Sequence, residues 1–181
     1  MIRGGTMTGE WALSEVHSDL QPFTLVGDPQ SIGSAIIRWI EVGLSTRVVR
    51  GRKMRTRGGL FDEFAAAMQF PLYFGENWDA FDECVADLEL PAGRGHLVVI
   101  TEPDQVLADA DATQLSVLAG SLRSAAADWA QPIEQGAWWD RPAVPFHVVL
   151  AGTRAEVESA ARLWAAAGLP TAPLDDQKSG G

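Results

Sequence analysis

Short runs of aliphatic and β-branched residues alternate along the chain with longer stretches in which apolar residues recur every three or four positions. The short runs predict strands at 23–26, 46–50, 97–100 and 146–150. The longer stretches predict helices, each with one apolar face, around 32–40, 60–68, 115–129 and 157–164. This alternation of strands and helices favours an α/β fold with a mainly parallel sheet.

The first and last predicted strands lead into helices that end alike. Each strand is followed by a glycine and then by a helix that closes with Trp-x-x-x-Gly-Leu, at 39–44 and at 164–169. The last helix also opens with Thr153-Arg-Ala-Glu156, the pattern of a capping box. Either one β-α unit has been duplicated, or two unrelated units pack a helix against the sheet in the same way. In both cases we expect these units to extend the central sheet at its edges.

The acidic stretch FPLYFGENWDAFDECVADLEL, at 70–90, separates the second predicted helix from the third predicted strand. Residues 77–89 have the periodicity of a helix that buries one face against a core. Its apolar stripe consists of Trp78, Phe81, Val85 and Leu88. Either Asn77 or Glu76 can cap the start of this helix, directly after a turn that ends at Gly75.

Four carboxylates fall on a neighbouring side of the same predicted helix: Glu76, Asp79, Glu83 and Asp87. Like charges four residues apart on a helix are destabilising, and no lysine or arginine lies one turn away to offset them. The helix dipole favours acids in the first turn, but Glu83 and Asp87 lie beyond it. Local stability therefore does not explain why these carboxylates are here.

Four explanations of these carboxylates stay open. They could be the solvated surface of an acidic protein, or ligands of Mg²⁺ or Ca²⁺, although the sequence has no loop of alternating oxygen ligands. A pair of them could act as acid and base, but no second group in the sequence would separate their pKa values. Finally, they could meet a strongly basic cleft on another protein, with Tyr73 as an aromatic anchor beside them.

Charge is distributed unevenly along the chain. Residues 75–111 hold ten acids and one base, whereas residues 47–57 hold six bases and no acid. The net charge of −10 argues against general binding to nucleic acid, because that binding needs Lys and Arg to replace condensed counterions. The basic run 47–57 is either an exposed edge that balances the acidic half or a contact for RNA or an acidic partner.

Length and composition predict a single globular domain with appendages. The chain has 181 residues, of which 46% are apolar and 21% charged. Its longest apolar runs are much shorter than the roughly 20 residues that span a bilayer, and its start lacks the pattern of a signal peptide. The single cysteine, Cys84, excludes an intrachain disulfide. We expect a soluble cytoplasmic protein, in which His17, His96 and His147 are too scattered to suggest a metal or catalytic site.

The segment Tyr73-Phe-Gly75-Glu76-Asn77-Trp-Asp79-Ala80 closely resembles the signature of the barstar family, in which Tyr-Tyr-Gly-Glu-Asn-Leu-Asp-Ala opens the inhibitory helix. The predicted strands and helices on both sides of this segment match the family order as well, so that the resemblance covers residues 46–151. It implies a small parallel sheet packed with helices, extended here by N-terminal and C-terminal β-α units.

The resemblance also implies a function. Barstar-family proteins are intracellular inhibitors that lay an acidic helix and its preceding loop over the active site of a barnase-type ribonuclease. The chain is then no enzyme and needs no cofactor or metal, and its partner is a basic extracellular-type ribonuclease or a related nuclease toxin. The expected partner-binding residues are Tyr73, Gly75, Glu76, Asn77, Asp79, Asp82 and Glu83. By position, Asp79 and Glu83 correspond to the two inhibitory aspartates, and Tyr73 to the loop tyrosine.

Three positions depart from the family pattern. Glu83 is one methylene longer than the aspartate usual at its position, and Asp82 stands where barstar has a tryptophan. Leu115 falls where barstar has a glutamate that contacts the nuclease, so we expect that contact to be lost. These departures leave the binding mode in place and the identity of the nuclease open.

Regions outside the resemblance complete the predicted organisation. We expect an N-terminal strand-helix extension at 1–45, a barstar-like domain at 46–151, a C-terminal helix at 152–169 and a flexible tail at 170–181. Residues 131–145 predict an ordered loop, in which Trp138-Trp139 is either an exposed binding patch or a lid on the sheet. The alternative function is a barstar-fold interaction or regulatory module that uses this tryptophan pair or the basic run 47–57.

Overall fold

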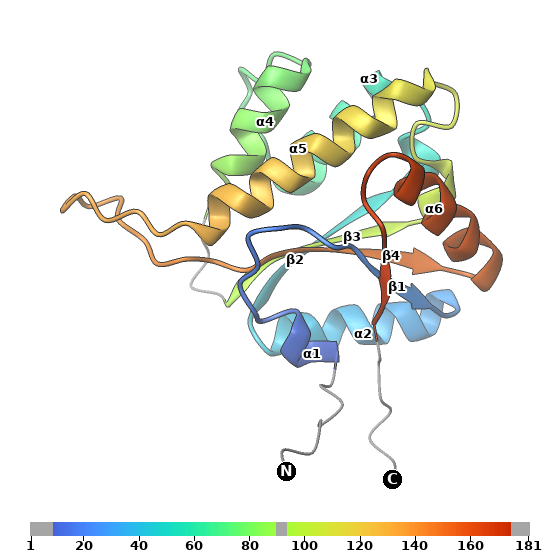
Figure 1. Ribbon diagram of the computed structural model, residues 1–181, viewed down its shortest axis with the longest axis horizontal. Helices are drawn as coiled ribbons and strands as arrows, with labels where there is room; N and C mark the ends of the chain where they lie inside the picture. The colour runs from blue at the N-terminus through green and yellow to red at the C-terminus, as the bar shows by residue number, and fades with distance from the viewer. Residues whose placement is uncertain (1–8, 90–93, 175–181) are drawn as a thin grey trace, which may run out of the picture.

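The computed structural model describes residues 9–89 and 94–174 of the chain. Its centre is one parallel sheet with the strand order β2-β3-β4-β1-β5 (Figure 1). The strands are β1 (Phe23–Val26), β2 (Leu44–Arg50), β3 (Gly95–Thr101), β4 (Phe146–Gly152) and β5 (Ala172–Pro173). The first four contain the four predicted runs, so the predicted α/β fold with a parallel sheet is confirmed.

Helices cover both faces of the sheet (Figure 1). One face carries α1 (Gly9–Ala12) and α2 (Pro29–Glu41). The other carries α3 (Arg57–Met68), α4 (Trp78–Ala86), α5 (Ala112–Ala130) and α6 (Arg154–Ala166). Two short 3₁₀ helices, η1 (Gly51–Lys53) and η2 (Pro103–Gln105), follow β2 and β3.

The central strands are buried on both faces. In β4, Val148 and Leu150 belong to the core beneath α3 to α6, whereas Val149 and Ala151 belong to the core beneath α2. All seven residues of β4 are buried. This two-sided burial explains why the β4 sequence is apolar throughout and does not alternate with polar residues.

Side chains at the N-caps fix where the helices begin. The side chains of Asp28, Thr56, Asn77 and Thr153 accept backbone N–H groups in the first turns of α2, α3, α4 and α6. At α6 the Glu156 carboxylate also accepts the Thr153 backbone N–H at 2.8 Å. The predicted capping box is therefore confirmed.

The two similar units at the ends of the chain lie side by side in the sheet. Strand β1 pairs with β4, so β4 is central, and the expectation that both units extend the edges was wrong for the last one. The chain crosses from β1 to β2 in one direction and from β4 to β5 in the other. Because parallel crossovers share one hand, α2 and α6 fall on opposite faces. Both helices are followed by a left-handed glycine, Gly43 with φ 95° and Gly168 with φ 101°, as predicted.

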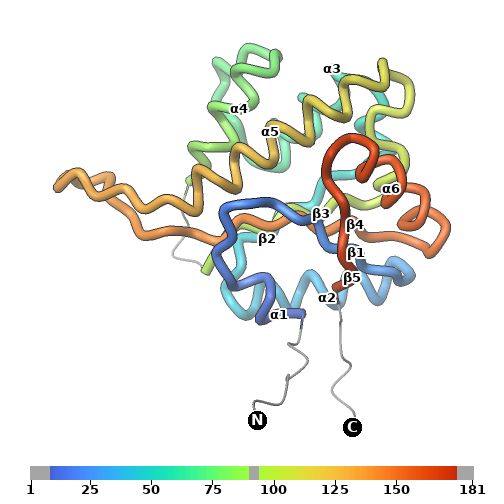
Figure 2. The backbone as a smooth tube through the Cα atoms, in the orientation of Figure 1, coloured from blue at the N-terminus to red at the C-terminus, as the bar shows by residue number. Residues whose placement is uncertain are grey.

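Part of the predicted flexible tail is ordered. Residues 172–173 form β5 and pair with β1 (Figure 2), and Leu174 is buried. The prediction of a loose tail from residue 170 was therefore wrong as far as Leu174, because backbone pairing and the burial of one leucine hold this segment. The rest of that tail, 175–181, lies outside the described residues, as do residues 1–8.

Candidate functional site

The turn before α4 is fixed by aromatic packing. The Phe74 backbone N–H donates to the Pro71 carbonyl at 2.9 Å. The Phe74 ring then packs edge-on against Phe61 and Phe70, with centroid distances of 5.7 and 5.1 Å. Because Phe74 points into the core, Tyr73 points out of it, and the tyrosine side chain is 86% exposed.

Gly75, Glu76 and Asn77 set the entry into α4. The Asn77 side chain donates to the Gly75 carbonyl at 3.2 Å and accepts the Ala80 backbone N–H at 2.9 Å. A Cβ atom at Gly75 would lie only 3.1 Å from the Asn77 side-chain nitrogen, so glycine fits this approach best. Glu76 has a φ of 50°, a left-handed conformation that costs a residue with a side chain about 1 kcal/mol. Of the two predicted caps, Asn77 is the one observed.

The apolar stripe of α4 joins the core as predicted. Phe81 and Val85 are fully buried, and Trp78 packs against Phe61 and Phe81 with centroid distances of 5.0 and 5.5 Å. The Trp78 indole N–H donates to the Gln114 side chain of α5 at 3.0 Å. These contacts hold the start of α4 against α3 and α5.

The end of α4 is held by a second indole. The buried Trp129 N–H of α5 donates to the Val85 carbonyl at 3.0 Å. The helix ends at Ala86, three residues before the predicted end at 89. Leu88 still packs against the core although it lies beyond the helix. The α4 helix is therefore fixed at both ends, which makes its outer surface a rigid one.

The outer surface of α4 and of the turn before it is acidic, and we call four of its carboxylates the acidic face: Glu76, Asp79, Asp82 and Glu83. All four residues are exposed. Within residues 9–89 and 94–174, none of them forms an ion pair with Lys, Arg or His. The structure brings all seven predicted partner-binding residues together on one exposed surface, Tyr73 and Gly75 in the turn and the others at the start and along the side of α4.

Comparison with known families agrees with this geometry. A sequence model described as "Barstar (barnase inhibitor)" matches residues 44–151, which is more than half of the chain. The chain belongs to the barstar family. The matched region runs from β2 to β4 and includes the Tyr73 turn and α4. A search of curated proteins finds no similar sequence.

Two of the positions that depart from the barstar pattern, Asp82 and Leu115, lie in different environments. Asp82 is exposed on α4, so it adds charge to the acidic face where the family has an aromatic ring. Leu115 is buried in the core, and the loss of a partner contact at this position stays a prediction. The barstar-family sheet formed by β2, β3 and β4 is extended beyond β4 by β1 and β5.

Half of the basic side chains in the basic segment, which we define as residues 47–57, form ion pairs within the chain. These ion pairs are Arg50 with Glu63, Arg52 with Glu102 and Arg55 with Asp109. The hydrogen bonds from Arg50 hold the pKa of the Glu63 carboxyl below its usual range. Three of the six basic residues of this segment are therefore balanced by acids of the same chain.

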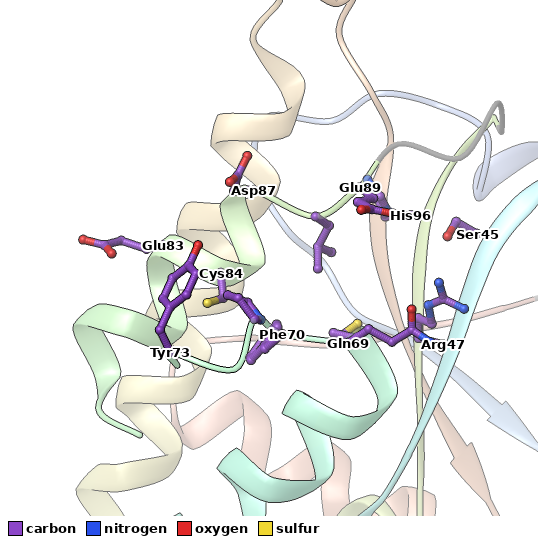
Figure 3. A pocket seen from close by; sticks show the side chains of 13 residues that line it. Ser45, Arg47, Gln69, Phe70, Tyr73, Glu83, Cys84, Asp87, Glu89 and His96 are labelled. Atoms are coloured by element: carbon purple, nitrogen blue, oxygen red, sulfur yellow. The ribbon is translucent and has the colours of Figure 1, made fainter. Parts of the chain in front are cut away.

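A groove with a volume of about 480 Å³ runs between the α4 side of the site and strand β2 (Figure 3). Its lining includes Arg47, Gln69, Tyr73, Glu83, Asp87 and Glu89. In Figure 3 the Glu83 carboxylate points away from the groove, and Arg47 lies on the opposite side. Burial, together with the Glu83 and Asp87 charges, raises the pKa of the Cys84 thiol beside them, so Cys84 is a poor nucleophile.

His96 of β3 also lines this groove, and the sequence carried no signal for it. The residue is 4% exposed, its ring lies 4.5 Å from that of Trp129, and its Nε2 atom has no hydrogen-bond partner among the described residues. Burial, assisted by the charges of Arg141 and Arg47, lowers the pKa of His96 to about 4. The imidazole is therefore neutral at pH 7.

The other two histidines, His17 and His147, come together near α1, with ring centroids 5.8 Å apart. Within the described part of the chain, no group of three His, Cys, Asp or Glu side chains could hold a metal ion. The same part of the chain contains no helix that is long and apolar enough to cross a membrane.

Residues 131–145 form an ordered loop that projects beyond the end of α5 (Figure 1). Ile133 and Arg141 pair at its base, and Arg141 also donates to the backbone carbonyls of Trp129 and Gln131. At the tip, Trp138 is 91% exposed and Trp139 51% exposed. The tryptophan pair is therefore no lid on the sheet, and of the two predicted alternatives the structure supports the exposed patch.

Proposed function

We propose that this protein inhibits a barnase-type ribonuclease, or a related basic nuclease, by covering its active site with the acidic face and the Tyr73 turn. One observation carries the proposal: a rigid helix and the turn before it present four exposed carboxylates, and none of them has a cationic partner among the described residues. Cations on a partner would complement them. The protein then acts as an inhibitor and not as an enzyme, in the cytoplasm.

The chemistry of a ribonuclease site fits such a surface. A site that binds a phosphodiester is lined by cationic side chains, which form strong charge-assisted hydrogen bonds with a carboxylate as well as with a phosphate. Asp79 and Glu83 are one turn apart on α4, so they can enter the same cleft. Because both ends of α4 are fixed by Trp78 and Trp129, little conformational entropy is lost on binding.

Tyr73 supplies an apolar contact next to these charges. Its ring is exposed, yet the turn that carries it is held by Phe74 in the core. Tyrosine is enriched among the residues that dominate binding energy in protein interfaces. Tyr73 is therefore proposed as the anchor at the edge of the contact.

The proposal is tested by titrating the full chain against barnase and against the product of any nuclease gene adjacent to the gene for this chain, with RNA cleavage as the readout. We expect inhibition of at least one of them by the wild type and weak inhibition by Asp79→Ala and Glu83→Ala. Asp62→Ala, which removes an exposed carboxylate from α3, is the matched control and should inhibit like the wild type. If all variants inhibit equally the mechanism is wrong, and if neither nuclease is inhibited the function is wrong.

The second candidate function is an interaction module that uses the Trp138-Trp139 loop. The observation in its favour is the exposure of both tryptophans on a loop braced by Arg141. The basic segment is less suited to this function, since three of its arginines already have acidic partners. This candidate predicts that partner binding survives charge reversal of Glu76, Asp79 and Glu83 but is lost in the double variant Trp138→Ala with Trp139→Ala.

A further inference from the structure

The groove beside α4 is continuous with the acidic face but has a different character. Tyr73 and Glu83 belong to the lining of the groove as well as to the candidate site. Its other carboxylates, Asp87 and Glu89, are exposed and form no ion pair within the described residues. Arg47 lines the same groove from β2, and it too forms no ion pair in that part of the chain. The groove therefore offers unpaired charge of both signs.

A buried polar atom provides a second, independent observation. The Nε2 atom of His96 lacks a hydrogen-bond partner among the described residues, although His96 is 4% exposed and lines the groove. A buried polar atom without a partner costs about 1 to 3 kcal/mol. A neutral imidazole nitrogen can either accept a hydrogen bond or donate one. A ligand in the groove that reaches this nitrogen would supply the missing partner.

We propose that the groove binds a segment of the partner nuclease in which an arginine side chain lies next to a carboxylate. This inference rests on the proposed function, because it takes the occupant from the same nuclease that meets the acidic face. The guanidinium lies against Asp87 and Glu89, where its fork of donors matches carboxylate oxygens. The neighbouring carboxylate accepts hydrogen bonds from Arg47.

Other classes of occupant fit these charges less well. An anion such as phosphate would be repelled by Asp87 and Glu89, and a simple cation would leave Arg47 without a partner. An apolar ligand would remove all three charged groups from water without compensation. The volume of about 480 Å³ is within the range of sites that hold a small ligand or a few side chains.

The test needs no nuclease, because N-acetyl-L-arginine carries both required groups, a guanidinium and a carboxylate. The full chain is titrated with this compound and followed by two-dimensional NMR. We expect saturable shifts at millimolar concentration for the backbone amides of Arg47 and Asp87 and for the ring Nε2 of His96. N-acetyl-L-arginine amide, which lacks the carboxylate, should bind more weakly, and N-acetyl-L-norleucine, which lacks the guanidinium, should cause no saturable shift.

Matched variants assign each end of the probe to its side of the groove. The double variant Asp87→Asn with Glu89→Gln should weaken binding of both arginine compounds by about threefold or more. Arg47→Gln should weaken binding of N-acetyl-L-arginine but leave binding of its amide unchanged. Asp62→Asn, on the outside of α3, should change neither.

Two results would overturn the inference: no saturable shift up to about 50 mM probe, or shifts confined to the acidic face at Asp79 and Glu83. The RNA cleavage assay tests the proposed function separately. A chain that inhibits the nuclease but does not bind the probe in the groove retains the proposed function and contradicts this inference. A chain that binds the probe but inhibits neither nuclease contradicts the proposed function, and with it the assignment of the groove to a nuclease.

Discussion

In the basic segment, Arg50, Arg52 and Arg55 each form an ion pair of 2.7 Å within the chain. In the acidic face, no carboxylate has such a partner in the part of the chain that the structure describes. The partners of the three arginines lie 13, 50 and 54 positions away in the sequence. A run of like charge is therefore not by itself a binding surface, because the fold can neutralise part of it with residues that are distant in the sequence.

Arg47 marks the boundary between the two regions. It belongs to the basic segment by sequence, but it lines the groove together with Asp87 and Glu89. Its neighbours Arg50 and Arg52 interact with α3 and η2 instead, through Glu63 and Glu102. Whether a charge in this protein is balanced internally or left for a partner is therefore decided residue by residue.

The largest expected effect comes from neutralising the acidic face with Asp79→Asn and Glu83→Gln together. The dissociation constant for the inhibited nuclease should rise by about 100-fold or more, since losing one partner of a buried interfacial charge pair costs about 2 to 5 kcal/mol, a range that rests in part on barnase and barstar themselves. The free energy of unfolding should stay the same or rise, because like charges one turn apart repel. Calorimetric titration and urea denaturation measure the two quantities. A clear loss of stability would contradict the view that these charges serve only a partner.

The next effect concerns His96, which lies on β3 between the two regions. Its pKa falls from 6.5 to about 4 in the folded protein, so the unfolded state binds more protons between these pH values. The free energy of unfolding should therefore be highest above pH 6.5 and fall by up to about 3 kcal/mol as the pH drops toward 4.

The His96 prediction is checked by urea denaturation at several pH values from 7 to about 4.5, above the range in which most carboxylates titrate. His96→Gln should flatten the pH dependence. Parallel profiles for His96→Gln and the wild type would show that this group does not control the slope.

Salt should affect the two regions differently: it should slow association with the nuclease but change the free energy of unfolding little. We expect the association rate with the nuclease to fall about tenfold or more between about 0.05 and 0.5 M NaCl, because the unpaired acidic face attracts a basic partner over distances that salt screens. The ion pairs of the basic segment are in direct contact, so the unfolding free energy should change much less with salt. Stopped-flow mixing measures the rate, and a rate independent of salt would contradict electrostatic attraction.

The smallest expected effect comes from breaking a pair in the basic segment. Glu63 accepts hydrogen bonds from the Arg50 backbone N–H at 3.0 Å and from its guanidinium at 2.7 and 3.1 Å. Glu63→Ala should lower the free energy of unfolding by about 1 kcal/mol and leave nuclease affinity unchanged. Asp62→Ala, at the adjacent exposed position, is the control and should have almost no effect on either. A loss of nuclease affinity in Glu63→Ala would contradict the distinction between charges that are paired within the chain and charges that bind the nuclease.

Much of the fold could be predicted because its signals are local. The strands, the apolar stripe of α4 and the capping box at Thr153 all follow from residue spacing within a few positions. The end of α4 was less predictable, since Leu88 continues the apolar stripe but packs from outside the helix. Strand β5 was missed because a segment of two residues has no periodicity, and only pairing with β1 orders it.

The candidate site, too, could be predicted from the sequence only in part. The Tyr73 to Glu83 motif and its resemblance to the barstar family could be recognised from sequence alone, and the structure places these residues together on one exposed surface. His96 could not be identified, since a histidine beside an apolar strand looks the same whether its ring nitrogen is satisfied or not. Its exposure and its missing hydrogen-bond partner depend on Trp129 and on the walls of the groove.

The sequence by itself determined most of the helices and strands, the amphipathic character of α4 and the family of the chain. Only the tertiary structure decided which charges are paired, where the groove lies and that α4 is fixed at both ends by Trp78 and Trp129. The physical reason is the number of residues along the chain over which each kind of interaction acts. Helical periodicity and capping act over about four residues, whereas an ion pair or a groove depends on distances in space between residues far apart in the chain.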